Sequence, residues 1–188
     1  MVKKIIITGG LGYIGTELCK IYSGVSWHHK IIVIDNRFIS ERVNQIRNWN
    51  MEFIHGDILN KELVNKYFKD ADIVHHLAGI TDVPRTKSES NSEKDKKIIL
   101  VGEKGTNNIL EAISNECKII FPSTHVVYEG IDKVKNDIKE NEETKPVLSY
   151  SSSKAANEKQ LKKSGKNYVI LRLGSVYGYS TDTARIDI

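Results

Sequence analysis

Short apolar runs alternate along the chain with longer segments in which apolar residues recur at helical spacing. Six runs rich in β-branched residues are predicted strands: 5–7, 31–34, 51–54, 73–77, 119–121 and 168–171. We expect Pro122 to end the fifth strand, because proline cannot donate a backbone hydrogen bond. Helical spacing follows the first strand, through Glu17, Leu18 and Ile21, and recurs at 60–69, 94–115 and 149–164, where Gly165 ends the last helix.

The predicted strands lack the polar alternation of a strand that has one face in water, so both of their faces should be buried. Regular alternation of such strands with helices predicts an α/β fold, a doubly wound parallel sheet (Rossmann fold) with helices on both faces. Residues 82–97 are polar and residues 131–147 are highly charged, which indicates loops in both places.

Composition narrows the class of protein further. The 188 residues, 39% hydrophobic and 28% charged, fit an ordinary domain with a real core. The net charge of +4 is small and its lysines stand in mixed-charge runs, so we expect no nucleic-acid partner. The apolar run before Thr8 is too short for a signal peptide, and no stretch approaches the ~20 apolar residues of a membrane span. The expectation is a cytoplasmic protein with no membrane association.

The two cysteines, Cys19 and Cys117, lie far apart and outside any metal-ligand spacing. We therefore predict buried free thiols and no metal site.

A glycine-rich turn follows the first strand, with the sequence Thr8-Gly9-Gly10-Leu11-Gly12-Tyr13-Ile14-Gly15. Such a turn lets backbone N–H groups approach a diphosphate that a Cβ would block, and the following helix directs its positive end at the phosphates. The second strand ends at Asp35, followed by Asn36, where an acid can accept hydrogen bonds from the ribose 2′-hydroxyl. This favours NAD over NADP, although Arg37 is an opposing signal because a nearby arginine can accommodate a 2′-phosphate. The predicted cofactor-binding residues here are Gly9, Gly12, Tyr13, Ile14, Gly15, Asp35 and Asn36.

Tyr150 and Lys154 stand four residues apart, on one face of a predicted helix. A phenol of pKa ~10 is a weak base, but a neighbouring ammonium favours the phenolate and lowers its pKa. Tyr150 would then take a proton from a substrate hydroxyl while a hydride leaves to the cofactor. The same spacing also occurs in surface pairs with no chemistry. Ser123 and Thr124 follow the fifth strand, where a hydroxyl faces the ligand crevice of such a sheet.

These motifs, in this order, resemble the extended branch of the short-chain dehydrogenase/reductase superfamily, the NAD-dependent epimerase/dehydratase family. The resemblance covers essentially the whole chain and adds Gly56-Asp57-Ile58, His76-Leu77-Ala78-Gly79, Gly105-Thr106, Val127-Tyr128 and Leu171-Arg172-Leu173. It implies that Asp57 and Ile58 flank the adenine, that Leu77, Ala78, Gly79 and Ser123 line the cofactor, and that Lys154 also binds the nicotinamide ribose. It assigns catalysis to Thr124, Tyr150 and Lys154, and substrate binding to Thr124 and to Ser175, which stands where many epimerases have an asparagine near the substrate phosphates.

Several positions depart from the family pattern. His125 and Val126 stand where the 4,6-dehydratases have an Asp-Glu pair, which disfavours that dehydratase reaction and weakens the decarboxylating alternative. Gly102 replaces an asparagine usual three residues before the Gly-Thr pair, and Glu129 is inserted between Tyr128 and the next glycine. His125 is either a proton donor to the substrate or a loop histidine with a structural role.

The resemblance also sets domain and partner expectations. We divide the chain into an NAD-binding domain at 1–174 and the start of a substrate-binding region at 175–188, with the C-terminal substrate domain largely missing. The expected function is nucleotide-sugar epimerase chemistry; the alternatives are a reductase or dehydratase of the same superfamily, or an NAD-binding fragment without turnover. The expected partners are a nucleotide-sugar substrate and a second copy, bound through a helix bundle of 94–115 and 149–164.

Overall fold

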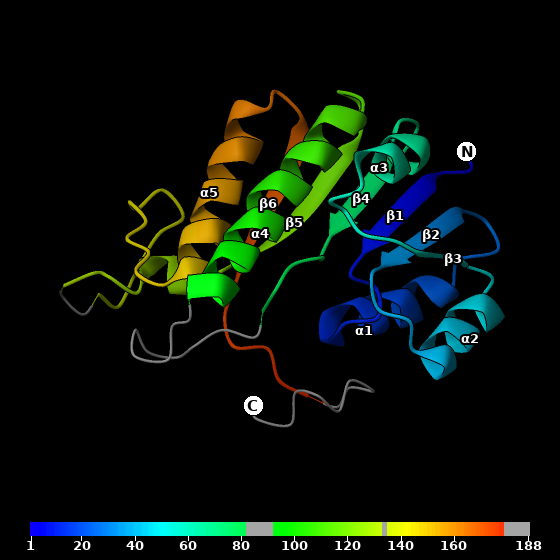
Figure 1. Cartoon of the computed structure of the whole chain (residues 1–188), viewed down its shortest axis with the longest axis horizontal. Helices are drawn as coiled ribbons and strands as arrows, with labels where there is room; N and C mark the ends of the chain where they lie inside the picture. Colours follow the sequence, from blue (N-terminus) through cyan, green and yellow to red (C-terminus); the bar gives the residue numbers. More distant parts are fainter. Residues whose placement is uncertain (82–91, 133–134, 179–188) are drawn as a thin grey trace.

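A computed structural model describes residues 1–81, 92–132 and 135–178, in which strands and helices alternate (Figure 1). The strands are β1 (Lys4–Thr8), β2 (Lys30–Asp35), β3 (Glu52–His55), β4 (Ile73–His76), β5 (Lys118–Thr124) and β6 (Asn167–Leu173). The helices are α1 (Tyr13–Ser23), α2 (Ser40–Asn48), α3 (Lys61–Phe68), α4 (Ser92–Ala112) and α5 (Ser149–Lys163), with a 3-10 helix, η2 (His125–Tyr128). All six predicted strands are therefore present, and α2 is an addition to the prediction.

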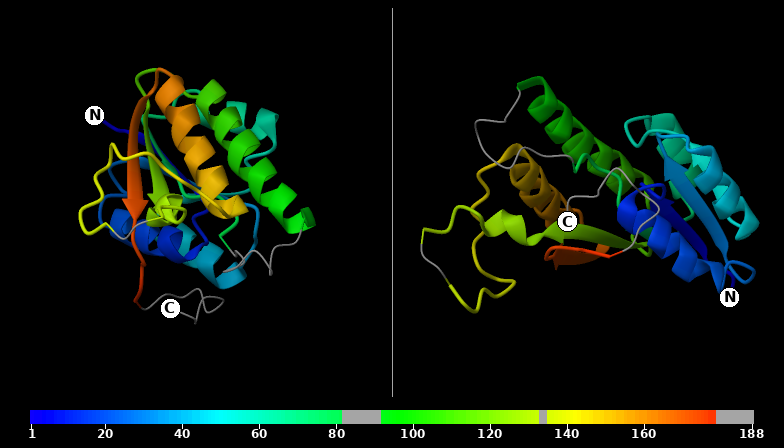
Figure 2. Two further views of the ribbon diagram at one scale, coloured as in Figure 1. Left: turned by 90° about the vertical axis from the view of Figure 1, so that its left-hand side faces the viewer. Right: turned by 90° about the horizontal axis from the view of Figure 1, so that it is seen from below.

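The strands form one parallel sheet in the order β3-β2-β1-β4-β5-β6. Figures 1 and 2 show α3, α4 and α5 on one face and α1 and α2 on the other. This confirms the doubly wound parallel sheet. The chain crosses from β3 back past β1 to β4, so the carboxyl ends of β1 and β4 meet at the point where the strand order reverses, which is where ligands bind in such sheets.

Two hydrophobic cores fill the spaces above and below the sheet. Successive strand residues point to opposite faces, so Ile6 packs under α3, α4 and α5 with Phe121 and Leu161, while Ile7 packs with Val33 against α1 and α2. Both cysteines are buried free thiols, as predicted, one in each core.

The expectation that Pro122 ends the fifth strand is wrong, since β5 continues to Thr124 and pairs with β6 over its whole length. The Lys118 N–H donates to the Asp72 carbonyl on the β4 side, and N–H directions alternate along a strand, so position 122 also faces the β4 side. The β4–β5 pairing ends at Ile120. The missing N–H of Pro122 would point to the β4 side, where β5 is no longer paired. Proline therefore costs the sheet no hydrogen bond at this position.

Helix and loop boundaries differ modestly from expectation. Residues 92–97 belong to α4 rather than to a loop, with Glu93 and Asp95 in the first turn, where acidic side chains favour a helix N-terminus. The remainder of the predicted 82–97 loop lies outside the described residues. Within 131–147 the described residues form neither helix nor strand, as expected. Gly165 has φ +69° and follows α5, which confirms its role in ending that helix.

Candidate dinucleotide and reaction site

The glycine turn after β1 is held against the segment that follows β4. Gly9 has φ +67°, and a Cβ there would lie 2.8 Å from the Ala78 nitrogen, so only glycine fits. A Cβ on Gly15 would collide with the Gly9 carbonyl oxygen. The Gly12 N–H donates to that same carbonyl at 3.0 Å, which closes the turn.

Helix α1 begins directly at this turn. Gly12 is its N-cap and supplies no side-chain acceptor, and the first turn holds no acidic residue. Tyr13 and Ile14 are the first helical residues, so their end of α1 carries uncapped backbone donors and the positive end of the helix dipole. This is the arrangement that binds a diphosphate at a helix N-terminus.

At the end of β2, Asp35 is 6% exposed and both of its carboxylate oxygens have partners. Oδ2 accepts the Leu11 N–H at 2.9 Å, and Oδ1 accepts the Arg37 N–H at 2.9 Å. The Arg37 Nε lies 3.5 Å from Oδ1. The carboxylate thus stands beside the glycine turn, as the sequence predicted, and is already part of a hydrogen-bonded unit.

The predicted adenine residues, Asp57 and Ile58, follow β3, and Asn36, another predicted cofactor residue, follows β2. The Asn36 side-chain amide donates to Asp57 Oδ2 at 3.0 Å, and Asp57 Oδ1 accepts the Leu59 N–H at 2.9 Å. Ile58 is 4% exposed and packs against Gly105 of α4, where a Cβ would overlap its side chain. The structure thus brings Asn36 and Asp57 together at the edge and places the Ile58 side chain in the core.

A buried polar chain joins β1, β4 and α4 beneath the predicted cofactor. Thr8 Oγ1 accepts the Ala78 N–H at 3.0 Å and contacts His76 Nδ1 at 3.2 Å, while His76 Nε2 lies 2.9 Å from Thr106 Oγ1. Burial, together with the charge of Lys154, lowers the pKa of His76 to about 3, so this imidazole stays neutral. These hydrogen bonds fix Ala78 next to Gly9. The quoted sequence motifs contain these residues, but the hydrogen bonds among them were not predicted.

The reaction end of the site is built around Lys154 on α5. Its Nζ donates to the Pro122 carbonyl at 2.8 Å and lies 4.4 Å from the Phe121 ring centroid and 5.9 Å from the Tyr150 ring centroid. Burial lowers the pKa of Lys154 to about 8. The structure therefore brings Tyr150 and Lys154 to one small cavity, which is also lined by Ala78, Gly79, Ile80 and Ser153.

The hydroxyls at the end of β5 have internal partners. Ser123 Oγ donates to Glu158 Oε1 at 2.6 Å, and Thr124 Oγ1 accepts the Val126 N–H at 3.2 Å, which caps η2. Both residues are almost fully buried. Thr124 stands at the predicted carboxyl edge of the sheet, whereas the Ser123 side chain is turned towards α5.

Glu158, and its pairing with Arg172 of the quoted Leu171-Arg172-Leu173 motif, is a structural feature of the site that sequence reasoning missed. Arg172 on β6 donates from Nε to Glu158 Oε1 at 2.9 Å and from Nη2 to Oε2 at 2.6 Å, a two-pronged pair that is almost fully buried. The hydrogen bonds to Arg172 and Ser123 lower the pKa of Glu158 against its burial. The sequence did contain one indication of Glu158. It stands four residues after Lys154, which places both side chains on the same face of α5.

Glu129, the inserted residue, fixes the start of α5. Its Oε1 accepts the N–H groups of Val147 and Leu148 at 2.7 Å each, and it also accepts from the Ser151 hydroxyl. The N-cap Leu148 has no side-chain acceptor of its own, so Glu129 supplies the missing carboxylate next to Tyr150. His125 Nδ1 lies 3.1 Å from the Leu173 carbonyl, which is the structural role weighed for it.

Gly102 leaves room for the contact between α4 and α5. A Cβ there would overlap Ser153 Oγ, and the Gly102 carbonyl accepts from the Asn157 side-chain amide at 3.0 Å. Asn157 on α5 therefore supplies a polar contact to α4 at this point.

Ser175 is exposed and follows β6. Three residues later the chain lies against α1, where the Tyr13 hydroxyl donates to the Gly178 carbonyl at 2.6 Å. The described start of the predicted substrate region thus returns to the diphosphate turn. Residues 179–188 lie outside the described residues.

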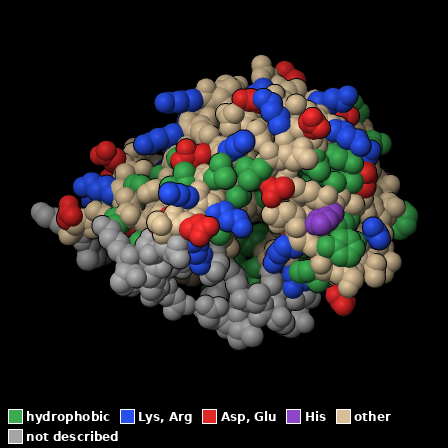
Figure 3. Space-filling view, viewed as in Figure 1, with side chains coloured by type: hydrophobic (Ala, Val, Ile, Leu, Met, Phe, Trp, Pro, Cys, Tyr) green, Lys and Arg blue, Asp and Glu red, His purple; other side chains and the backbone are tan. Residues whose placement is uncertain are grey.

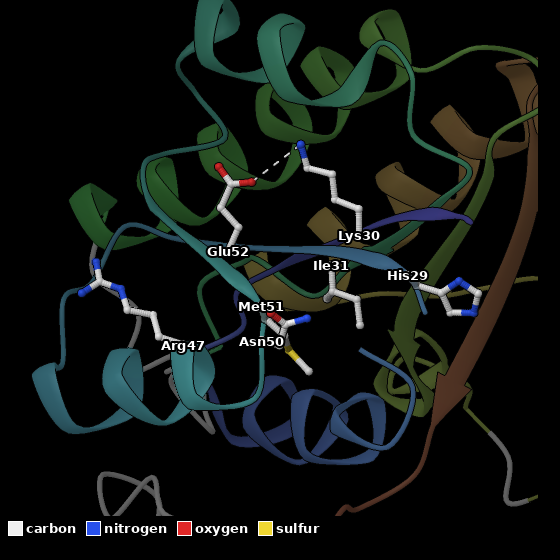
Figure 4. Close-up of a pocket in the computed structure, with 7 residues that line it drawn as sticks. All are labelled: His29, Lys30, Ile31, Arg47, Asn50, Met51 and Glu52. Atoms are coloured by element: carbon white, nitrogen blue, oxygen red, sulfur yellow. Dashed lines mark ion pairs between the residues drawn. The ribbon is translucent and has the colours of Figure 1, made fainter. Parts of the chain in front are cut away.

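A second concavity lies at the opposite ends of the strands, where β2 and β3 begin (Figure 4). It is lined by His29, Lys30, Ile31, Arg47, Asn50, Met51 and Glu52, and a Lys30–Glu52 pair spans 3.8 Å beside it. Ligands of doubly wound sheets bind at the carboxyl ends of the strands, so we place the dinucleotide and reaction site at that edge and not here.

The distribution of charged and metal-ligating side chains indicates no second kind of site among the described residues. On the face seen in Figure 3, basic and acidic side chains are interspersed. Across 1–81, 92–132 and 135–178, no group of three or more His, Cys, Asp or Glu side chains is arranged to hold a metal ion. Among the same residues, no helix combines the length and the apolar character that a membrane span requires.

A six-stranded parallel sheet whose first turn is a glycine phosphate cradle, together with a tyrosine–lysine pair on a helix beside β5, defines a dinucleotide-binding protein of the doubly wound class. The chain belongs to the NAD dependent epimerase/dehydratase family, whose model matches residues 5–187.

Individual relatives carry out related reactions on nucleotide sugars. The chain is 31% identical to a dTDP-D-glucose 4,6-dehydratase of Dictyostelium discoideum over 94% of its own length and 44% of that protein. It is 33% identical to a CDP-paratose 2-epimerase of Salmonella typhi over 93% and 58%. The UDP-glucuronic acid 4-epimerase of Bacillus cereus, solved with UDP-glucuronic acid and NAD, superposes with a TM-score of 0.75 at 27% identity, over 96% of this chain and 60% of that one. The chain thus spans about half the length of the curated relatives it matches.

Proposed function

We propose that this chain binds NAD along the carboxyl edge of its sheet and contributes the base of a nucleoside-diphosphate-sugar epimerase. The observation that carries the proposal is the buried Lys154 ammonium held between the Pro122 carbonyl and the Tyr150 ring, on the cavity that Ala78 and Gly79 also line. Bound NAD supplies a reversible hydride acceptor, so that the overall reaction has no net redox change.

The proposed cofactor residues follow the edge from one end to the other. Asn36 and Asp57, with Ile58 behind them, lie at the adenine end, and Asp35 lies at the ribose. Gly9, Gly12 and Gly15, together with the start of α1 at Tyr13 and Ile14, form the cradle for the diphosphate. Leu77, Ala78, Gly79, Ser123 and Lys154 lie towards the nicotinamide end. The Cβ-free turn and the uncapped helix start support this fit.

Within this proposal Tyr150 removes the proton from a sugar hydroxyl and returns it at the end of the cycle. Lys154 stays close enough to stabilise the phenolate, and the carbonyl of Pro122 holds the ammonium in place. Thr124 contributes a hydroxyl near the reacting oxygen and Ser175 a contact to the substrate phosphates. We assign 1–174 to cofactor binding and 175–188 to the start of the substrate region.

Two features favour epimerase chemistry over the dehydratase alternative. Val126 has no group that can transfer a proton, and His125 is engaged with the Leu173 carbonyl. Elimination of water needs an additional acid and base, and Val126 can be neither. A reductase of the same superfamily would use the same residues but would release its cofactor at each turnover. A cytoplasmic location and a homodimer through α4 and α5 complete the proposal.

The test compares the chain with its Tyr150→Phe variant. NAD binding is measured by calorimetry, and NADH formation is followed by absorbance after addition of UDP-glucuronic acid, CDP-paratose or dTDP-glucose. We expect the same NAD affinity in both proteins, a weak hydride transfer in the wild type, and a loss of about 100-fold or more in the variant. Loss of NAD binding in the variant, or unchanged hydride transfer, would contradict the role of Tyr150.

NAD binding with no hydride transfer from any of these sugars to the wild type would favour a non-catalytic cofactor-binding fragment. Steady consumption of NADH with a carbonyl substrate would favour the reductase.

A further inference from the structure

The adenosine end of the site carries a charge arrangement that the NAD assignment alone does not explain. An acid at the end of β2 usually excludes NADP because it repels the 2′-phosphate. Here that acid, Asp35, is inside a closed unit: one oxygen accepts from Leu11 N and the other from Arg37 N, both at 2.9 Å. The guanidinium of Arg37 adds an ion pair, with Nε 3.5 Å from Oδ1. The negative charge is therefore compensated before any ligand arrives.

The same guanidinium extends across the mouth of the phosphate cradle. A Cβ built on Gly12 would lie 3.7 Å from Arg37 Nη2, so the side chain reaches from the end of β2 to the N-cap of α1. Its side chain is 45% exposed. A guanidinium at this place presents a planar, permanently charged fork between the expected ribose and diphosphate positions.

The neighbouring side chains balance in charge, so the N-terminus of α1 sets the sign at the turn. A second guanidinium, that of Arg42, is 8% exposed and donates to the Leu11 carbonyl on the inner side of the turn. The other nearby acid, Asp57, accepts from the Asn36 amide and from the Leu59 N–H. Two arginines thus accompany two hydrogen-bonded carboxylates beside a helix N-terminus without acidic residues.

From this geometry, and resting on the proposed cofactor function, we propose that the site accepts the 2′-phosphorylated dinucleotide NADP as well as NAD. Arg37 is the residue that receives the 2′-phosphate. Its Nε stays paired with Oδ1 of Asp35 while its Nη groups, which reach towards Gly12, bind the phosphate, and Asp35 keeps its backbone donors from Leu11 and Arg37. Guanidinium–phosphate hydrogen bonds are charge-assisted and two-pronged, which offsets the repulsion from the carboxylate.

The test uses two small probes that differ only in the 2′-phosphate, 5′-AMP and adenosine 2′,5′-bisphosphate, with binding to the whole chain measured by calorimetry. In the wild type, the bisphosphate should bind at least as tightly as 5′-AMP. Arg37→Gln should weaken the bisphosphate about tenfold or more, the loss of a charge-assisted contact, and change 5′-AMP less than about threefold.

Arg47→Gln is the matched control, because Arg47 is an exposed arginine at the opposite edge of the sheet (Figure 4). It should change neither affinity. NADP and NAD should follow the same pattern as the two probes. Weaker binding of the bisphosphate than of 5′-AMP by the wild type, or an equal change of both ligands in Arg37→Gln, would overturn the proposal. If the wild type binds 5′-AMP but not the bisphosphate, the NADP inference is wrong and the proposed NAD binding is retained. If it binds neither probe, both the proposed cofactor function and this inference are wrong.

Discussion

At the scale of single residues, Lys154 combines a functional position with a cost in stability. It is almost fully buried, and burial lowers its pKa from 10.5 to about 8. Between about pH 8 and 10.5 the unfolded chain therefore binds more protons than the folded chain at this position. The free energy of unfolding should rise with pH through this window, because the full cost of burying the ammonium is present below it and is relieved above it.

Replacement of this lysine is the first prediction at the residue scale. Near neutral pH, Lys154→Met should raise the free energy of unfolding by on the order of 1–3 kcal/mol, since a buried charge is exchanged for an apolar chain. It should also remove the rise at alkaline pH and abolish hydride transfer. Urea unfolding across the pH range measures the first two effects. Lys159→Met, on the exposed side of α5, is the control, and a less stable Lys154→Met protein would show that the bond to Pro122 outweighs the burial.

The neutral state of His76 gives a second prediction, with the same sign in an acidic pH window. Its pKa is about 3 in the folded chain and 6.5 in the reference state, so the unfolded chain binds the extra proton first as pH falls. Stability should decline on the acid side of pH 6.5, and more gently in His76→Gln than in the wild type. His28→Gln, a change at an exposed histidine, should keep the wild-type slope in the same unfolding series. Parallel slopes for the wild type and His76→Gln would show that His76 does not control this acid sensitivity.

Single residues also show where sequence reasoning stops. Gly9, Asp35, Tyr150 and Lys154 were predicted because each satisfies a local rule of spacing and chemistry. The partner of Ser123 is Glu158, 35 residues further along, and nothing local connects them. Candidate positions can be predicted from sequence when the constraint is local, whereas a distant partner is seen only in the fold.

At the scale of elements, the junction of β1 and α1 is the least tolerant part of the site. A Cβ on Gly15 would overlap the Gly9 carbonyl, which is backbone and cannot turn aside. Gly15→Ala should therefore weaken NAD binding by about tenfold or more and lower the melting temperature, because α1 must move away from the turn. Calorimetry with NAD and thermal unfolding provide the two measurements.

The control for this change is Gly24→Ala, at the other end of α1. Gly24 has ordinary helical φ and its nearest built contact is 3.8 Å away, so alanine should be accommodated there. Wild-type affinity in Gly15→Ala would mean that the close approach of helix and strand is not needed for the cradle.

Elements were predicted well where apolar periodicity was strong and less well elsewhere. Helix α2 was missed because one of its three inward residues is Arg42, whose guanidinium bonds the Leu11 carbonyl, so the inward face does not read as an apolar stripe. The extension of β5 through Pro122 depends on where β4 stops, which no local pattern contains. The first turn of α5 depends on Glu129, a carboxylate from another segment.

At the scale of the whole molecule, α4 and α5 pack side by side over one face of the sheet (Figures 1 and 2). α4 leaves Ile99 39% and Leu100 49% exposed, side chains that a second copy would cover. We predict a dimer in solution that Leu100→Lys weakens about tenfold or more, because a charge would enter the apolar contact. Sedimentation over a range of concentrations measures the association.

Leu171→Lys is the comparison for the dimer. Leu171 is 43% exposed on β6, and it faces away from α4 and α5 because its neighbour Ile170 packs in the core beneath those helices. A monomeric wild type would contradict the dimer, and a dimer disrupted only by Leu171→Lys would place the contact on the sheet face.

Pro122 has one more consequence, for the shape of the opening between β4 and β5. An exposed strand edge attracts other strands through its free N–H groups, and proline removes one such donor. The stretch of β5 beyond Ile120 therefore cannot form an unbroken ladder with residues 77–81 after β4 leaves the sheet. The two strands therefore stay apart beyond Ile120, beside the small cavity that Ala78, Gly79 and Lys154 line.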